Sequence, residues 1–190
     1  MDTLLSICIG VGLSAACGFR VFVPLLIMSI ASISGQLTLA PEFDWIGSYP
    51  ALAAFAVAAF LEISAYYIPW LDNLLDSVAV PSAIIAGTIV MASFVTEMSP
   101  FLKWVFAVIV GGGVAGTVQG FTTLARATSS IATGGLGNPL ISTFEAGGSI
   151  ALSIFAISLP MVAVVAALGI IYYAFMKIYR KLFGQKALNS

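Results

Sequence analysis

Apolar residues are concentrated in five long runs along the chain, separated by short polar stretches. The runs cover residues 3–34, 51–69, 79–96, 101–125 and 144–176. A helix needs about 20 apolar residues to cross the hydrocarbon core of a bilayer. The pattern therefore predicts that each of the three middle runs is one membrane-spanning helix.

The first and last runs are longer than one crossing requires. A helix of roughly 33 residues extends about 50 Å, whereas the hydrocarbon core is about 30 Å thick. Each of these runs contains a helix breaker, Pro24 in the first and Pro160 in the last. Each is therefore either a tilted helix or a broken one. We expect five or six crossings in a single all-α polytopic membrane domain over residues 1–190.

The composition supports a membrane protein and narrows its chemistry. The chain is 61% hydrophobic and 8% charged, whereas soluble domains carry about 25% charged residues. Its net charge is −1 and it has no run of Lys or Arg that could neutralise phosphates, which argues against nucleic acid as a partner. It has no His, and Cys8 and Cys17 fall on opposite faces of a helix. We expect membrane lipids as partners, and neither a metal nor a cofactor.

Basic residues near the end of the chain indicate its orientation. They follow an aromatic group typical of a membrane interface, Tyr172, Tyr173, Phe175 and Tyr179, and they are Lys177, Arg180, Lys181 and Lys186. Because basic residues stay on the cytoplasmic side, the C-terminus is predicted to be cytoplasmic, in an inner (cytoplasmic) membrane. The first run lacks the positive flank of a signal peptide and is too long for its apolar region, so we interpret it as a retained span.

Two helices share a pattern of small residues. Gly10, Ser14 and Gly18 precede Phe19, and Gly112, Gly116 and Gly120 precede Phe121, with a displacement of 102 residues. Three crossings would separate the two copies, which predicts an inverted repeat of residues 1–98 and 101–182, as in many secondary transporters. Coincidence between two Gly-rich helices is the alternative. In either case small residues at every fourth position allow close helix packing, within the chain or in a homo-oligomer.

Charged residues inside the apolar runs are the strongest functional signal. Arg20 lies midway along the first run, where only protein or trapped water could solvate it. Glu62 in the second run is the natural partner, with Tyr66 one turn later as a hydroxyl donor. These residues are candidates for a substrate or ion site. The alternative is a buried ion pair that only fixes the helix register.

A short acidic stretch is a candidate cation site. Asp72, Asn73, Asp76 and Ser77 would form one polar face if the stretch is helical. Two carboxylates there could hold a cation at the membrane surface. The alternative is a solvated interfacial turn.

The polar segment "TTLARATSSIATGGLGNPLISTFEAGGS", residues 122–149, separates the last two apolar runs. It is too polar to face lipid, and its Thr-Gly-Gly-Leu-Gly-Asn-Pro centre breaks helices. We therefore predict a re-entrant, non-helical loop that lines a cavity, with an ordinary connecting loop as the alternative. Its candidate ligands are Arg126, Thr133, Gly134, Gly135, Asn138, Ser142 and Glu145.

The sequence also resembles a known family, the small bacterial membrane proteins catalogued as domain of unknown function 4126. The resemblance spans nearly the whole chain. It rests on the Gly-rich first helix running into Pro24-Leu25-Leu26, on Glu62 with Ile68-Pro69, Asp72 and Asp76, on Pro81 and Gly87, and on Arg126 with the 133–139 segment, Ser142 and Glu145. An Asp-Lys pair is typical before the Ile-Pro, whereas Tyr66 and Tyr67 stand here. The resemblance supports the choice of positions and implies no specific chemistry.

These features favour a transporter or channel for a small solute or ion, with a polar site near mid-membrane. In this hypothesis Arg20 and Arg126 hold an anion or the carboxylates of Glu62 and Glu145, and one glutamate takes up a coupling proton. The alternative is a non-transporting assembly or lipid-organising protein. An intramembrane enzyme is disfavoured because the chain lacks HExxH and G-x-S-x-G motifs, although a Glu62–Glu145 pair could in principle do acid–base chemistry.

Overall fold

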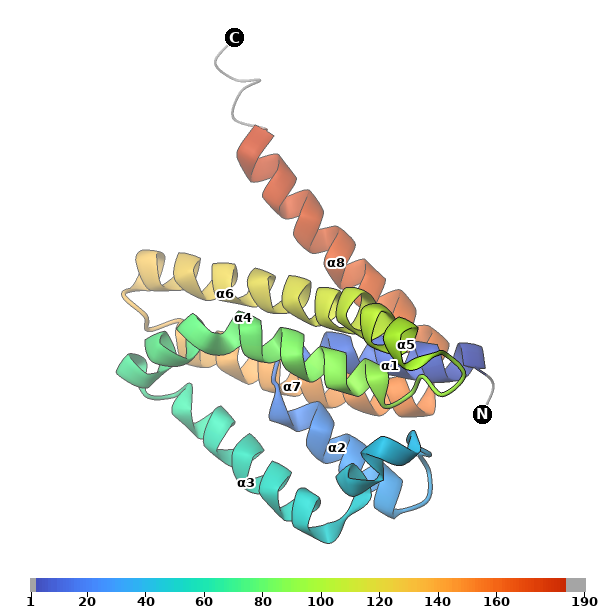
Figure 1. The fold of residues 1–190 in the computed structure, drawn as a ribbon. Helices are drawn as coiled ribbons and strands as arrows, with labels where there is room; N and C mark the ends of the chain where they lie inside the picture. Colours follow the sequence, from blue (N-terminus) through green and yellow to red (C-terminus); the bar gives the residue numbers. More distant parts are fainter. Residues whose placement is uncertain (1–2, 184–190) are drawn as a thin grey trace.

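The computed structural model describes residues 3–183, and the side chains in this range except those at 69, 70, 72, 73, 174 and 177–183. Every regular element in the described residues is a helix (Figure 1). In chain order they are α1 (Thr3–Cys17), α2 (Phe22–Ile33), the 3-10 helix η1 (Pro41–Gly47), α3 (Tyr49–Ala65), α4 (Pro69–Ala92), α5 (Pro100–Phe106), the π-helix η2 (Ala107–Gly112), α6 (Gly113–Thr133), α7 (Asn138–Ser158) and α8 (Pro160–Phe183). The predicted all-α class is confirmed.

The helices are those of a multi-pass membrane protein. Three segments are long and apolar enough to cross a bilayer, namely Leu74–Ala92, Pro100–Thr133 and Asn138–Ser158. Shorter apolar helices lie at Thr3–Cys17, Phe22–Ile33 and Pro160–Tyr173, and η1 and α3 form one further apolar pair bent by 64°. Pro100–Thr133 is one nearly continuous helix of 34 residues, about 50 Å, which exceeds the thickness of a bilayer core.

Both long runs are broken helices. The first breaks at residues 18–21, and Pro24 lies in the first turn of α2, where a missing backbone N–H costs nothing. The break therefore precedes the proline expected to cause it. The last run breaks at Leu159, directly before Pro160 at the start of α8. Pro24 and Pro160 thus lie in the first turns of their helices, whereas Pro81 lies inside α4.

Helix α1 is the centre of the bundle, because it contacts α2, α4, α6, α7 and α8. In Figure 1, α1, α4, α6 and α7 run alongside one another, α2 and α3 form a pair on one side, and α8 projects away from the bundle. The core is built from small and aliphatic side chains, with Ile9, Leu13, Met28 and Val90 fully buried. Such small residues let the helices approach closely.

The predicted small-residue stripes pack mainly on α4. A methyl group added to Gly10 would overlap Met91, and one added to Gly112 or Gly116 would overlap Ile84 or its neighbour Thr88. Ser14 donates a hydrogen bond to the Gly87 carbonyl of α4 (2.9 Å). Gly18 instead lies against α6, where a methyl group would come 2.5 Å from Val118 Cβ. Gly120 has open space beside it, so the prediction that it packs is wrong within this chain.

The closest helix contact involves a glycine pair outside those stripes. A methyl group on Gly87 of α4 would come 2.6 Å from the carbonyl oxygen of Gly111 in η2. Gly111 in turn faces the Gly87 backbone. The π-helical turn is therefore the place where α4 and the long 100–133 helix meet backbone to backbone.

The Gly- and Thr-rich segment is a helical hairpin, so the predicted non-helical conformation is wrong, whereas its predicted re-entry into the membrane stays a prediction. Helix α6 continues to Thr133 and α7 begins at Asn138, so only residues 134–137 form a turn. Gly134 and Gly135 adopt positive φ (61° and 89°), which glycine tolerates. The hydroxyls of Thr128 and Thr133 donate to the carbonyls four residues earlier, so their polarity is satisfied within the helix.

Candidate functional site

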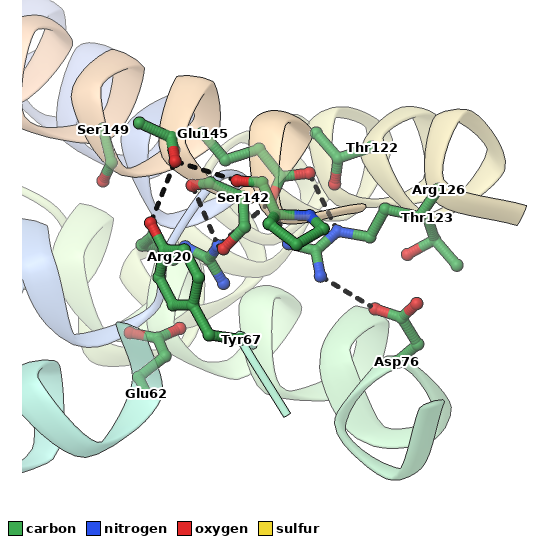
Figure 2. A network of polar contacts seen from close by, with 12 residues as sticks. Arg20, Glu62, Tyr67, Asp76, Thr122, Thr123, Arg126, Ser142, Glu145 and Ser149 are labelled. Carbon is green, nitrogen blue, oxygen red and sulfur yellow. Dashed lines mark hydrogen bonds and ion pairs between the residues drawn. The ribbon is translucent and has the colours of Figure 1, made fainter. Parts of the chain in front are cut away.

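Two buried arginines meet one glutamate at the centre of the bundle (Figure 2). Arg126 of α6 donates from Nε to Glu145 Oε1 of α7 at 3.0 Å, and its Nη2 contacts Oε2 of the same carboxylate. Arg20 Nη2 lies 3.3 Å from that same Oε2. The two arginines are 1% exposed and the Glu145 side chain 4%. We call Arg20, Arg126 and Glu145 the arginine cluster.

Three segments far apart in the sequence build this cluster. Arg20 lies in the break between α1 and α2, and the α6–α7 hairpin brings Arg126 opposite Glu145. Ser142, one turn before Glu145, accepts a hydrogen bond from Arg20 Nη2 at its hydroxyl (2.6 Å) and another at its carbonyl (3.1 Å). The break between α1 and α2 thus contains the arginine whose guanidinium contacts α7.

The ring of Tyr66 holds both arginines. The Cζ atoms of Arg20 and Arg126 lie 3.9 and 3.8 Å from its centroid. A cation over an aromatic face is attracted by the ring quadrupole, most strongly where water is excluded. Tyr66 was predicted as a hydroxyl donor, whereas its observed contribution to the site is the aromatic face.

Asp76 of α4 extends the cluster on the other side of Arg126. Its Oδ1 lies 3.7 Å from Arg126 Nη1, and Figure 2 shows Arg126 between Asp76 and Glu145. Asp76 therefore compensates an arginine, and its predicted place in a cation site with Asp72 stays a prediction. The Asp72 side chain lies outside the described residues. No group of three His, Cys, Asp or Glu side chains suited to a metal occurs among the described residues.

Glu62 does not make the predicted ion pair with Arg20. Its carboxylate accepts hydrogen bonds from the backbone N–H groups of Val21 (2.7 Å) and Phe22 (3.0 Å). These are unsatisfied donors at the start of α2, where a negative charge is also favoured by the helix dipole. Glu62 therefore caps α2 from the neighbouring helix α3. In Figure 2 it lies on the opposite side of Arg20 from Glu145.

The remaining predicted ligands divide between the buried face of α7 and the hairpin turn. Asn138 is buried and donates to Ser130 Oγ (2.9 Å) across the hairpin. Thr133 and Gly134 are exposed at the turn, and Gly135 is half-buried there. The turn is held by a hydrogen bond from the Gly137 N–H to Thr133 Oγ1 (3.0 Å). These residues stabilise the hairpin.

Sequence reasoning missed the rest of a polar stripe on α7. Its buried polar residues, Asn138, Ser142, Glu145, Ser149 and Ser153, follow helical spacing along one face. Ser149 donates to the Ala16 carbonyl of α1 (3.0 Å). This spacing was visible in the sequence, but the predicted loop concealed it.

A third buried cation, Lys103, lies away from the arginine cluster, and sequence reasoning missed it as well. Lys103 of α5 contacts Glu42 of η1, with Nζ 3.2 Å from Oε2, and lies 5.2 Å from the ring centroid of Phe43. Its side chain is 9% exposed, whereas that of Glu42 is 69% exposed. These residues line a cavity of about 340 Å³ together with Trp104 and Met98.

Two larger cavities approach the arginine cluster and share no lining residue. One, of about 530 Å³, lies between α6, α7 and α8 and is lined by Glu145 and Thr122. The other, of about 360 Å³, lies between the start of α2 and helices α3, α4 and α6, and is lined by Glu62, Tyr66 and Gln119. Gln119 Nε2 donates to Thr122 Oγ1 (3.2 Å), which links the two linings along α6. The cluster therefore lies between the two cavities, with Glu145 on one and Tyr66 on the other.

The family described as Domain of unknown function (DUF4126) has a model that matches residues 7–180. No curated protein and no solved structure matches the chain. The match contains every residue of the arginine cluster.

Proposed function

The chain belongs to the DUF4126 family, and from its site we propose that it is a transporter or channel for a small solute or ion. The substrate is handled at the arginine cluster, near the middle of the bundle. The observation that carries this proposal is that two separate cavities border the cluster, one lined by Glu145 and the other by Tyr66, whose ring contacts both arginines. A carrier needs such an arrangement, because its binding site must be reached from two directions.

The energetic cost of the cluster supports a functional reading. A charged side chain at the centre of a bilayer costs about 2.5–3.5 kcal/mol on insertion scales. Replacing a buried ion pair by well-packed apolar residues is often neutral or stabilising, so stability alone gives little reason to keep one. Buried charges of this kind commonly mark ion or substrate pathways.

Glu145 is the better candidate for a coupling proton. Protonation would neutralise the carboxylate that both arginines share, and would therefore free the cluster to take another anion. Glu62 is held by two backbone N–H groups of α2, so its protonation would weaken a helix cap. We therefore place proton coupling at Glu145.

A matched set of variants tests transport against the alternative of an assembly or lipid-organising protein. The fourfold variant Arg20→Met, Arg126→Met, Glu145→Leu and Asp76→Asn removes the paired charges together and leaves none of them unpaired. Purified wild-type protein in liposomes is expected to carry at least one solute from a panel of impermeant ions, organic anions, sugars and amino acids. The fourfold variant is expected to remain folded and to carry none. Retained flux in this variant would contradict the proposal, and absence of flux in both proteins would favour assembly.

Cavity access provides a second test. Single cysteines at Ser82 and Ala166 line the two cavities. In a background without Cys8 and Cys17, we expect an impermeant thiol reagent to reach them from opposite sides of the membrane. Labelling of both from the same side would contradict a pathway through the cluster.

We further propose a topology of five or six crossings, with inverted halves at residues 1–98 and 101–182, a homo-oligomer, and a cytoplasmic C-terminus in an inner membrane. The basic residues that suggest this orientation, Lys177, Arg180, Lys181 and Lys186, lie outside the described side chains. Reporter fusions after residues 35, 98 and 183 measure the side of each connection. Cross-linking in the membrane measures the number of subunits.

A further inference from the structure

The larger cavity has apolar walls and a charged end. Aromatic and aliphatic side chains line it: Phe19, Phe121, Phe144, Ile141 and Ile170. Its polar lining residues are Glu145, Thr122 and Tyr173. Its volume, about 530 Å³, lies in the usual range for small-molecule sites, about 300–1,000 Å³. A molecule that fills it would place an apolar body among the phenylalanines and any polar head at Glu145.

Arg20 contacts Glu145 without lining the cavity, and it has hydrogen-bond donors that Glu145 does not use. Arg20 Nε and Nη1 are buried and have no hydrogen-bond partner among the described residues. Buried side-chain donors are nearly always hydrogen-bonded in proteins, so such atoms call for an explanation. The Arg20 guanidinium bonds Ser142 and Glu145 through Nη2 alone.

The charge of the cluster restricts what can bind there. Arg20 and Arg126 are compensated by Glu145 and Asp76. A further anion would give an excess of negative charge unless one carboxylate is neutralised. Asp76 binds Arg126 away from Glu145, whereas Glu145 lines the cavity. A ligand carboxylate can therefore replace the Glu145 carboxylate with the same charge and planar shape, and guanidinium groups bind both in the same way. A phosphate dianion would add a charge.

We propose that the 530 Å³ cavity binds a monocarboxylate with an apolar body, which takes the place of Glu145 on Arg20 and Arg126. This inference names a substrate class for the proposed transporter, and the claim that the ligand crosses the membrane rests on that proposed function. Glu145 takes one proton from the aqueous phase as its carboxylate leaves the arginines. One proton and one carboxylate then travel together, without net charge. Among the described side chains, the charged and titratable groups around Glu145 are Arg20, Arg126, Asp76 beyond Arg126, Glu62 beyond Arg20, Tyr66 at the end of α3, and Tyr173 of α8.

Isosteric ligands test the head and the body separately. Purified full-length protein is mixed with hexanoate, hexanol, hexylamine or acetate, and the unfolding midpoint is measured. Hexanoate is expected to raise the midpoint, because a ligand that binds only the folded state stabilises it. Hexanol and hexylamine lack the carboxylate and acetate lacks the body, so they are expected to leave it unchanged. An equal shift with acetate, or with hexylamine or hexanol, would overturn the proposal.

Proton uptake tests the exchange at Glu145. Calorimetric titration with hexanoate in two buffers of different ionisation enthalpy gives the number of protons taken up. Wild-type protein is expected to take up close to one proton per hexanoate, and Glu145→Gln none. Glu145→Gln is also expected to bind about tenfold more tightly, because no competing carboxylate remains. Weaker hexanoate binding in folded Glu145→Gln would show that Glu145 is a ligand contact, and would overturn the exchange.

A cavity-filling variant keeps the test informative if Glu145→Gln does not fold. Gly169 of α8 lines the cavity, and a Cβ added there meets no atom within 4 Å, so the side chain of Gly169→Leu starts in open space. The matched control is Gly147→Leu on α7, which also has open space but does not line the cavity. Gly169→Leu is expected to abolish hexanoate binding and Gly147→Leu to preserve it. Equal binding in both variants would move the ligand elsewhere.

The carboxylate could come from water or from the membrane. The competition experiment is done in nanodiscs, with oleate dissolved in the lipid. If oleate competes with hexanoate, a membrane fatty acid is a ligand of the same site. If it does not, the carboxylate comes from water. Hexanoate binding with proton uptake but no flux of any solute would retain this inference and reject transport. Flux of another solute without hexanoate binding would retain the transport proposal and reject the carboxylate site.

Discussion

The molecule contains two buried cation sites that resemble each other in composition and differ in surroundings. Each combines a basic side chain, a carboxylate and an aromatic ring: Arg20 and Arg126 with Glu145 and Tyr66, and Lys103 with Glu42 and Phe43. In the arginine cluster the carboxylate is 4% exposed, and in the lysine pair the carboxylate is 69% exposed. Two cavities end at the first site.

The two sites differ in the solvent exposure of their carboxylates. This exposure separates the structural Lys103–Glu42 pair from the arginine cluster, which is the candidate site. Glu42 stays solvated, so its attraction for Lys103 is screened and contributes little. Glu145 is buried beside two arginines and one turn away from Ser142. If its negative charge is lost, another group must compensate the arginines. A ligand is one such group, and a proton together with a ligand is another.

The largest expected effect is the loss of Glu145. Glu145→Leu leaves two arginines buried without their shared carboxylate, and removal of one partner of a buried pair costs about 3–5 kcal/mol. Reversible unfolding in mixed detergent micelles measures this, with Glu42→Leu as the matched change in the lysine pair. Glu42→Leu is expected to leave the unfolding midpoint nearly unchanged. Comparable losses in both variants would remove the distinction between the sites.

The next effect concerns the aromatic rings. Tyr66→Leu keeps an apolar side chain but removes the ring between the arginines, and a desolvated cation–π contact is worth about 2 kcal/mol. Phe43→Leu is expected to cost less, because Lys103 lies 5.2 Å from that centroid whereas the arginines lie 3.8 and 3.9 Å from Tyr66. Tyr66→Phe should behave like the wild type in the same unfolding measurement. A loss in Tyr66→Phe equal to that in Tyr66→Leu would assign the effect to the hydroxyl.

A smaller effect is expected for Lys103. Lys103→Met retains an aliphatic side chain in the 340 Å³ cavity and removes only the charge. The aliphatic part of a lysine is commonly buried while its ammonium group stays near water. The unfolding midpoint should change little, and flux, where present, should persist. A complete loss of flux would show that Lys103 belongs to the transport pathway, and the two cation sites would then no longer differ in function.

The smallest effect is the response to salt. Coupling between Lys103 and Glu42, measured by a double-mutant cycle, should decline between 0.1 M and 1 M salt because the Debye length falls from about 10 Å to about 3 Å. Coupling between Arg126 and Glu145 should stay constant, since enclosed charges are screened far less. Parallel decline in both cycles would mean that water reaches the arginine cluster.

The sequence predicted the helical class and most of the residues of the site, but it could not give their pairing. Arg20, Arg126 and Glu145 stand out because charges are rare in apolar runs. Two glutamates could serve Arg20, and the choice depended on where α1 breaks. The break at residues 18–21 exposes the N–H groups of α2, and these take Glu62, which leaves Glu145 for the arginines.

The polar segment shows a second limit. Its Thr, Ser and Gly content is typical of loops, but the hydroxyls of Thr128, Thr133 and Thr143 each donate to the carbonyl four residues earlier in their own helix. Composition therefore suggested a loop where the backbone is helical. The periodicity of Ser142, Glu145 and Ser149 carried the correct information, because it recurs at one face of a helix.

The position of Arg20 also affects how the chain is made. Ser142 follows Arg20 by 122 residues, and Glu145 comes later still. At about 5–20 residues per second, a ribosome needs about 6–25 seconds to deliver them after Arg20. During that interval the nascent first helix pair contains a cation whose permanent partners do not yet exist. The charge of Arg20 must therefore be sheltered until the α6–α7 hairpin emerges, and the centre of the bundle cannot assemble before that point in synthesis.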